Sequence, residues 1–138
     1  MKSTLKWTGN RSFEATTEDG HSVTLGQAHG DSPKPGPSAM ELMLIGAGGC
    51  SAYDVVSILE KSRADVRDVT VEMEADRAED PPKVFTRIHF HFNVTGKGLK
   101  PAQIDRAIRL SVEKYCSATA ILERTATVTH DFTVITAD

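Results

Sequence analysis

The segment from Ser38 to Arg63 limits the possible folds more than any other part of the sequence. Its apolar and small residues recur at three- and four-residue spacings, and Ser38 and Glu41 form the S-x-x-E pattern of a capping box. This pattern predicts one long helix. The three glycines of "GAGGCSAYD" oppose it, because each weakens a helix by about 1 kcal/mol relative to alanine. Glycine leaves room for close approach, so we expect another chain segment to pack there or, less favoured, a ligand to bind beside Cys50.

Alternating apolar and polar residues predict three short strands before this helix. Two hairpin turns separate them, at Gly9–Asn10 and at Asp19–Gly20. The returning strand after the first turn places Arg11 on the same face as Phe13. Residues 26–37 contain too many glycines and prolines for a helix or a strand and are predicted to form a loop.

The same alternation predicts two strands after the helix, at residues 68–75 and 87–94. One has an acidic outer face and the other a basic one, which suits antiparallel pairing. Pro101 is predicted to begin a second helix, with Cys116 near its end and a last strand beyond it. The order βββ-α-ββ-α-β indicates an α+β fold, which we expect to form a single domain over residues 1–138.

Charge and hydropathy exclude several classes of partner. The chain has a net charge of -3 and no cluster of lysine and arginine, so we expect no binding to nucleic acid or to an acidic membrane surface. The N-terminus lacks the pattern of a signal peptide. The longest apolar stretch, from Leu42 to Tyr53, is too short to span a bilayer. These features predict a cytoplasmic protein.

Two other sets of polar residues resemble sites without matching them well. His89 and His91 share one strand face, as two metal ligands would, but no third ligand has a clear place, so we expect a solvated polar face and no metal. Ser51 and Asp54 lack a neighbouring histidine for a catalytic triad. We therefore expect no cofactor. The remaining histidines are scattered: His21, His29 and His130.

The two cysteines, Cys50 and Cys116, are stronger candidates. Free cysteines are often small buried hydrophobic residues, and that interpretation stays open. Both, however, follow amphipathic segments that can point toward one interior. A cysteine that reacts with peroxide needs a nearby cation or hydrogen-bond donors to stabilise its thiolate. A second cysteine within reach captures the resulting sulfenic acid as a disulfide.

The sequences around both cysteines are similar to one known family. "PSAMELMLIGAGGCSAYDVVSIL" around Cys50 and "SVEKYCSATAILERT" around Cys116 resemble the OsmC/Ohr family of thiol-dependent peroxide reductases, and look closest to its YhfA-like branch. The resemblance implies an intertwined homodimer with shared active sites, in which two central helices pack against wrapped antiparallel sheets. It also implies that Cys50 is the peroxidatic cysteine, that Cys116 is the resolving one, and that a dithiol reduces the disulfide.

One departure from the family pattern concerns the residues that activate the first cysteine. Peroxidatic members use an arginine oriented by a glutamate, and here Met40 occupies the glutamate position. Glu41 lies nine residues before Cys50, roughly opposite it on a regular helix, so we interpret Glu41 as a capping residue. Arg11 is the best candidate for the arginine. The residues expected to line an apolar substrate pocket are Met40, Met43 and Gly46.

Two functions therefore remain open. The first is a cysteine-based peroxidase that reduces organic hydroperoxides. The alternative is a binding module that keeps the fold and holds a small apolar or reactive ligand. Met40 in place of the acid favours the binding module, and the presence of both cysteines favours the enzyme.

Overall fold

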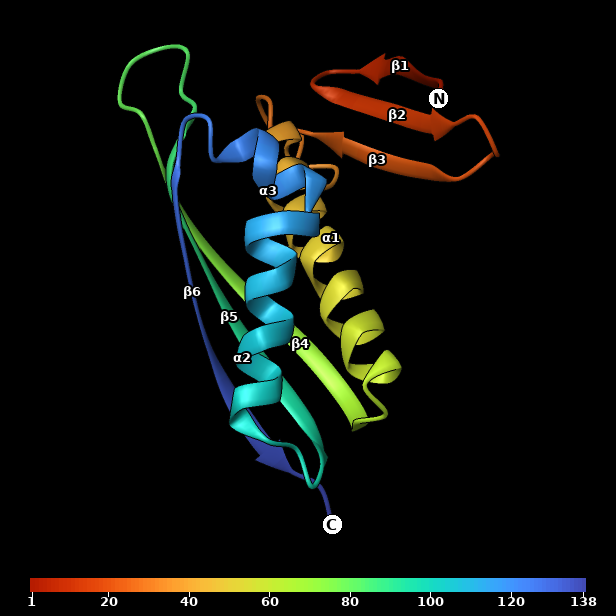
Figure 1. Ribbon diagram of the computed structural model, residues 1–138. Helices are drawn as coiled ribbons and strands as arrows, with labels where there is room; N and C mark the ends of the chain where they lie inside the picture. Colours follow the sequence, from red (N-terminus) through yellow and green to blue (C-terminus); the bar gives the residue numbers. More distant parts are fainter. The chain divides into compact units, whose positions relative to one another are not determined.

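The computed structural model describes all residues from 1 to 138 and divides the chain into two compact units, Met1–Met43 and Leu44–Asp138. The expectation of one domain stays a prediction. The first unit contains a three-stranded antiparallel sheet in the order β1-β2-β3 (Figure 1). Its strands are β1 (Ser3–Gly9), β2 (Ser12–Thr17) and β3 (Ser22–Gly26). The three strands predicted before the long helix are thus confirmed.

The first hairpin turn differs from its prediction by one residue. A bulge between Trp7 and Gly9 shifts the register so that Gly9 pairs with Ser12. The turn therefore consists of Asn10 and Arg11, and Asn10 adopts a φ of 48°, in the left-handed region that asparagine tolerates. Arg11 consequently lies in the turn, immediately before β2, where its backbone carbonyl accepts a hydrogen bond from Gln27 N at 3.0 Å.

One face of this first sheet is apolar and open in the single chain. Residues paired across the strands share a face, and two such rows are apolar. Trp7 is 64% exposed and Leu5 is 59% exposed. The rows are Leu5, Ala15 and Val23, and Trp7, Phe13 and Leu25.

The long helix α1 (Ala39–Lys61) begins with the predicted capping box. Ser38 N donates to Glu41 Oε1 at 3.0 Å, and Glu41 N donates to Ser38 Oγ at 3.2 Å. Lys34 forms an ion pair with the same carboxylate. The hydrogen bond from Lys34 has the largest effect on the pKa of Glu41, and those from Ser38 come next. Together they lower this pKa to about 2. Glu41 is therefore a capping residue, as the sequence indicated.

At 23 residues, α1 is longer than the apolar stretch from Leu42 to Tyr53. Its length and its mean hydropathy of 1.6 over 18 residues would suit a membrane span, as they also suit the core helix of a soluble protein. Only 28% of these 18 residues are buried within the chain. Much of the apolar surface of α1 thus lacks cover from the chain itself.

The second unit contains a sheet in the order β4-β5-β6, formed by β4 (Asp65–Arg77), β5 (Phe85–Lys97) and β6 (Thr127–Thr136). The predicted antiparallel pairing of β4 and β5 is confirmed, with Glu72 opposite His91. β5 and β6 instead run parallel, which differs from the wholly antiparallel sheets that we expected. The reason is that helices carry the chain back along the sheet between these two strands, so β6 starts at the same end as β5.

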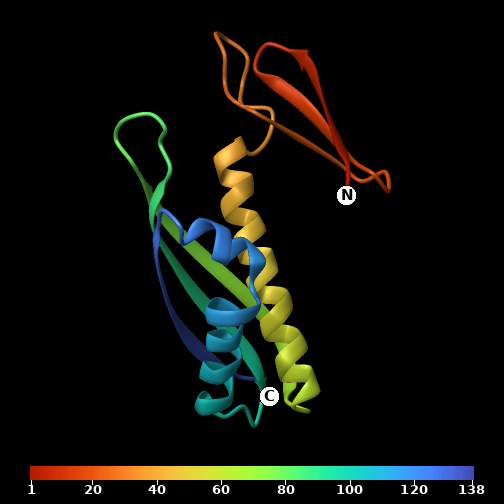
Figure 2. The same cartoon turned by 45° about the horizontal axis from the view of Figure 1, so that its top comes forward.

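This crossover consists of three consecutive helical segments. They are α2 (Pro101–Leu110), the π-helical turn η1 (Ser111–Tyr115) and α3 (Ser117–Leu122). Within the second unit, α1 and α2 lie on one face of the sheet (Figures 1 and 2). Burial of apolar surface between these layers is the main force that holds them together. The fully buried core residues include Val55, Leu59, Ile88, Phe90, Phe92, Val94, Ile104 and Ile108.

The three glycines of α1 do not have the same role. A Cβ atom at Gly48 would lie 2.1 Å from Met73 Sδ on β4, so Gly48 permits the close packing of α1 on the second sheet. Gly46 and Gly49 have no such neighbour within 4 Å in the single chain. The prediction of close packing is therefore explained by an internal contact at Gly48, while the other two glycines lie on an open face.

Candidate active site

The two free cysteines lie in the second unit and on different elements. Cys50 is half-buried in α1, whereas Cys116 is buried with 3% of its surface exposed. Cys116 follows η1 and caps the N-terminus of α3. Its backbone N–H donates to Ser111 O at 2.7 Å, a hydrogen bond across five residues that closes a π-helical turn. Such turns are rare and often occur at functional sites.

The sulfur of Cys116 makes three polar contacts. It accepts hydrogen bonds from Thr119 N at 3.3 Å and from Thr119 Oγ1 at 3.0 Å. As a thiol it donates to Ala47 O at 3.9 Å. Because Ala47 lies about one helical turn before Cys50, this contact places Cys116 against the part of α1 that carries the first cysteine.

The surroundings of Cys116 favour its protonated form. Burial raises the pKa of the Cys116 thiol above its ordinary value, because a low-dielectric environment disfavours the charged thiolate. The two hydrogen bonds from Thr119 act in the opposite direction, and the adjacent Cys50 side chain raises the pKa again. The structure thus brings together the two cysteines that the sequence singled out.

A buried polar contact fixes the helical turn before Cys116 onto α1. The hydroxyls of Ser51 and Ser111 lie 3.0 Å apart, and both residues are fully buried. Ser111 Oγ also donates to Asp54 Oδ2 at 3.0 Å. Ser51 and Asp54, which the sequence did not suggest as part of a catalytic triad, therefore form hydrogen bonds with Ser111 that hold this turn on α1. No motif in the sequence singled out Ser111.

The other predicted site residues lie on separate parts of the chain. The guanidinium of exposed Arg11 donates from Nη1 to Asn10 O at 3.2 Å within the first unit. Met40 is half-buried, and Met43 is 46% exposed. Gly46 lies on the open face of α1. Their roles as activating arginine and as pocket residues stay predictions.

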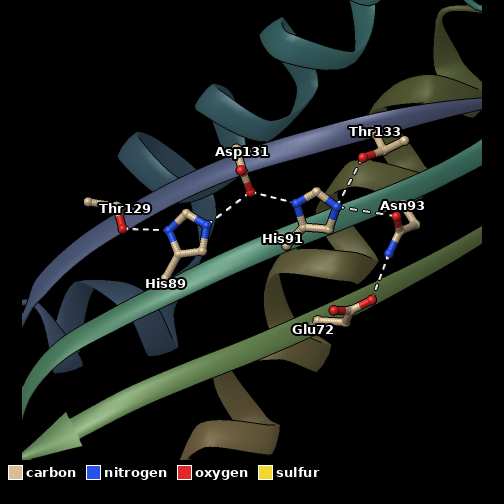
Figure 3. Close-up of polar contacts among 7 residues, drawn as sticks. All are labelled: Glu72, His89, His91, Asn93, Thr129, Asp131 and Thr133. Carbon is tan, nitrogen blue, oxygen red and sulfur yellow. Dashed lines mark hydrogen bonds and ion pairs between the residues drawn. The ribbon is translucent and has the colours of Figure 1, made fainter.

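The two histidines on β5 belong to a network on the polar face of the second sheet (Figure 3). Asp131 Oδ1 from β6 lies 2.9 Å from His89 Nε2 and 2.6 Å from His91 Nδ1. Its hydrogen bond raises the pKa of His91, while His91 and His89 together lower the pKa of Asp131. The sequence identified the polar face but missed Asp131, because only the parallel pairing of β5 with β6 places that residue beside both histidines.

The site thus offers one partly accessible thiol and one buried thiol on facing elements, with hydrogen-bond donors on the buried sulfur. This arrangement is suited to reversible formation of a disulfide between Cys50 and Cys116. The hydrogen-bond partners of the Cys116 sulfur are a backbone carbonyl, a backbone N–H and a hydroxyl.

Comparison with known proteins agrees with the resemblance seen in the sequence. The family described as "OsmC-like protein" matches residues 29–131. Protein YhfA of Escherichia coli is 44% identical over 137 residues, which cover 99% of this chain and 100% of that protein. The crystal structure of a hypothetical protein from Aquifex aeolicus has a TM-score of 0.88 at 27% identity and covers 99% of this chain and 97% of its own.

More distant solved structures share the fold alone. The organic hydroperoxide resistance protein OhrB of Bacillus subtilis has a TM-score of 0.63 at 16% identity, with 96% of each chain covered. The match of the family over most of the chain, together with the full-length relative, settles the assignment. This chain belongs to the OsmC family.

Proposed function

We propose that this protein is a thiol-dependent peroxidase that reduces organic hydroperoxides and protects against oxidative stress. The observation that carries the proposal concerns the two cysteines. Buried Cys116 contacts α1 at Ala47, about one turn before half-buried Cys50. Membership of the OsmC family supports it, because that family includes proteins described as organic hydroperoxide resistance proteins.

The reaction uses both sulfurs in turn. The Cys50 thiolate attacks one peroxide oxygen, the O–O bond breaks, and the alcohol leaves after taking up a proton. Cys50 is now a sulfenic acid. The Cys116 sulfur then attacks the Cys50 sulfur, the S–O bond breaks, and water leaves as the disulfide forms. A dithiol reductant restores both thiols by exchange.

The different burial of the two cysteines supports this assignment of roles. A peroxidatic cysteine must meet its substrate, and Cys50 is the more accessible of the pair. Cys116 is buried, and burial raises the pKa of its thiol, so it is protected from direct oxidation until a sulfenic acid forms beside it. We assign the peroxidatic role to Cys50 and the resolving role to Cys116.

The mechanism requires a group that stabilises the Cys50 thiolate. We propose that Arg11 stabilises its thiolate, and that Met40, Met43 and Gly46 form the apolar wall of the substrate site. Glu41 is engaged by Ser38 and Lys34 and is not available to orient an arginine. That engagement favours the second candidate function, a binding module for a small apolar or reactive ligand.

We also propose that the protein works as a homodimer with shared active sites. Apolar residues of α1 are exposed in the single chain, among them Ile45 at 49% and Tyr53 at 75%. Gly46 and Gly49 lie among them without an internal neighbour. A second copy is the occupant that the family membership favours, and obligate interfaces bury on the order of 2,000 Å² or more. A stable folded monomer in light scattering would exclude this assembly.

The deciding experiment treats the reduced protein with an organic hydroperoxide and measures free thiols and mass. We expect two thiols to be lost per chain, with one intramolecular disulfide formed. Cys116→Ser should instead accumulate sulfinic acid at Cys50 under excess peroxide. Arg11→Ala should slow alkylation of Cys50 at neutral pH, and Arg11→Lys serves as the matched control that keeps the charge.

Two results would favour the binding module instead. The first is that both thiols of the wild-type protein stay free after prolonged exposure to hydroperoxide. The second is an unchanged rate of Cys50 alkylation in Arg11→Ala.

Since the cycle needs a dithiol reductant, we propose a cytoplasmic location, where thiols are kept reduced.

A further inference from the structure

The resolving step of the proposed reaction poses a problem at Cys116. A thiolate is the nucleophile in disulfide formation, yet Cys116 is buried with 3% of its surface exposed. Its thiol donates to Ala47 O, a contact that exists only while the sulfur is protonated. Some group on the protein must therefore stabilise the thiolate at the moment of attack.

Thr119 is the residue placed to do this. Its Oγ1 lies 3.0 Å from Cys116 Sγ and its backbone N lies 3.3 Å away, so one residue directs two donors at one sulfur. Thr119 is itself 1% exposed, which keeps water from competing for these hydrogen bonds. Hydrogen bonds to a charged group are stronger than those to a neutral one, so both contacts strengthen when the thiol loses its proton.

The backbone holds this geometry in place. Cys116 ends η1, where its N–H donates to Ser111 O, and Ser111 is bound to Ser51 and Asp54 on α1. On the other side, Ala120 N, in α3, donates to Cys116 O at 3.0 Å. Cys116 and Thr119, three residues apart, are thus held in one turn, and the sulfur contacts Ala47 O on α1.

We propose that Thr119 is a catalytic residue of the resolving step, which stabilises the Cys116 thiolate through its hydroxyl and its backbone N–H as that sulfur attacks the Cys50 sulfenic acid. The Sγ–Sγ bond forms, the S–O bond of Cys50 breaks, and the hydroxide leaves as water with the proton that Cys116 gave up. The oxidant is the organic hydroperoxide of the proposed function, on which this inference rests.

A titration tests the role of Thr119 without any peroxide. In a Cys50→Ser background, the ultraviolet absorbance of the remaining thiolate is followed against pH, and the Cys50→Ser/Cys116→Ser variant supplies the tyrosine baseline. Thr119→Val keeps the side-chain shape and removes the hydroxyl, whereas Thr119→Ser keeps the hydroxyl. We expect Thr119→Val to reduce the thiolate population about tenfold at a fixed pH below the midpoint, with Thr119→Ser close to the parent.

A second measurement follows the step itself in the chain with both cysteines. Thr119→Val should consume the first equivalent of hydroperoxide at the parent rate, close the disulfide about tenfold more slowly, and accumulate sulfinic acid at Cys50. Circular dichroism identifies any variant that does not fold, in which case Thr119→Ala replaces valine. Identical titrations of the valine and serine variants would overturn the proposal. Absence of disulfide in the parent would overturn the peroxidase function, and the titration would still decide whether Thr119 stabilises the thiolate.

Discussion

The two three-stranded sheets carry similar sequence patterns and differ sharply in burial. In both, apolar residues alternate with polar ones and line up across the strands. On β5 the apolar row is fully buried, as Phe90 and Phe92 show. On the first sheet the equivalent row includes Trp7 at 64% exposure. Alternation therefore encodes which face of a sheet is apolar, and it does not encode what covers that face.

This difference in burial shows that the apolar core of a single chain lies in the second unit. There, α1 and α2 cover one face of the sheet, and the other face carries the polar network of Figure 3. The apolar face of the first sheet instead resembles the open face of α1, since both expose large apolar residues. We expect the proposed dimer to bury both of these surfaces.

The largest expected effect comes from the second sheet. Phe90→Ala should lower the free energy of unfolding by about 3–5 kcal/mol, because it leaves a cavity in a fully packed core. Trp7→Ala, at the exposed row of the first sheet, should cost the isolated chain no more than about 0.5 kcal/mol. Urea unfolding at several protein concentrations measures both. A Trp7→Ala loss that depends on concentration would show that a second copy covers this face.

The next effect concerns the contact of α1 with the second sheet. Gly48→Ala should destabilise the protein by about 1–2 kcal/mol, because its Cβ would displace the side chain of Met73. Gly49→Ala is the matched control, since its Cβ meets nothing in the single chain and alanine favours the helix by about 1 kcal/mol. Adding Met73→Ala should remove most of the Gly48→Ala penalty. Equal effects of the two glycine substitutions would contradict this contrast between the two faces of α1.

In the first unit, removal of the capping box of α1 should change the free energy of unfolding by a smaller amount. Ser38→Ala removes the oxygen that accepts from Glu41 N, and we expect a loss of about 1 kcal/mol in the free energy of unfolding. Ser38→Thr retains that oxygen and should stay near the wild type. Thermal unfolding monitored by circular dichroism compares the three proteins. The interpretation fails if alanine and threonine are equally tolerated.

The smallest effect is expected on the polar face of the second sheet. The pKa of His91 is raised above its ordinary 6.5, so its contribution is present below pH 6.5 and is lost as pH rises through the raised value. The pKa of Asp131 is lowered from 3.8, so its contribution is present above that pH and is lost on acidification. Between about pH 4 and pH 6.5, the contributions of His91 and Asp131 to stability are both present.

Asp131→Asn should therefore cost most between about pH 4 and pH 6.5, and by less than about 1 kcal/mol because the aspartate is largely exposed. Above the raised pKa of His91 the difference from the wild type should shrink. Asp76→Asn, which breaks the ion pair with Arg87 on the same sheet, is the control without a histidine. A constant difference from pH 5 to pH 9 would show that the histidines do not contribute.

Local patterns were sufficient for much of the fold because their causes are local. The capping box of Ser38 and Glu41 depends on residues three apart, and the helix that follows depends on spacing within one segment. The pairing of β4 with β5 followed from complementary faces on strands joined by a short connection. The order of elements, the OsmC family and the two candidate cysteines could all be predicted from the sequence.

The tertiary structure decided what depends on residues distant in sequence. The parallel direction of β6 follows from the crossover helices, and only that direction places Asp131 between His89 and His91. The role of Gly48 depends on Met73 from β4, which no pattern within α1 reveals. At the site, the π-helical turn and the contact of Cys116 with Ala47 bring the second thiol to α1, because the packing of α1 against the crossover, rather than spacing along the chain, sets which groups meet.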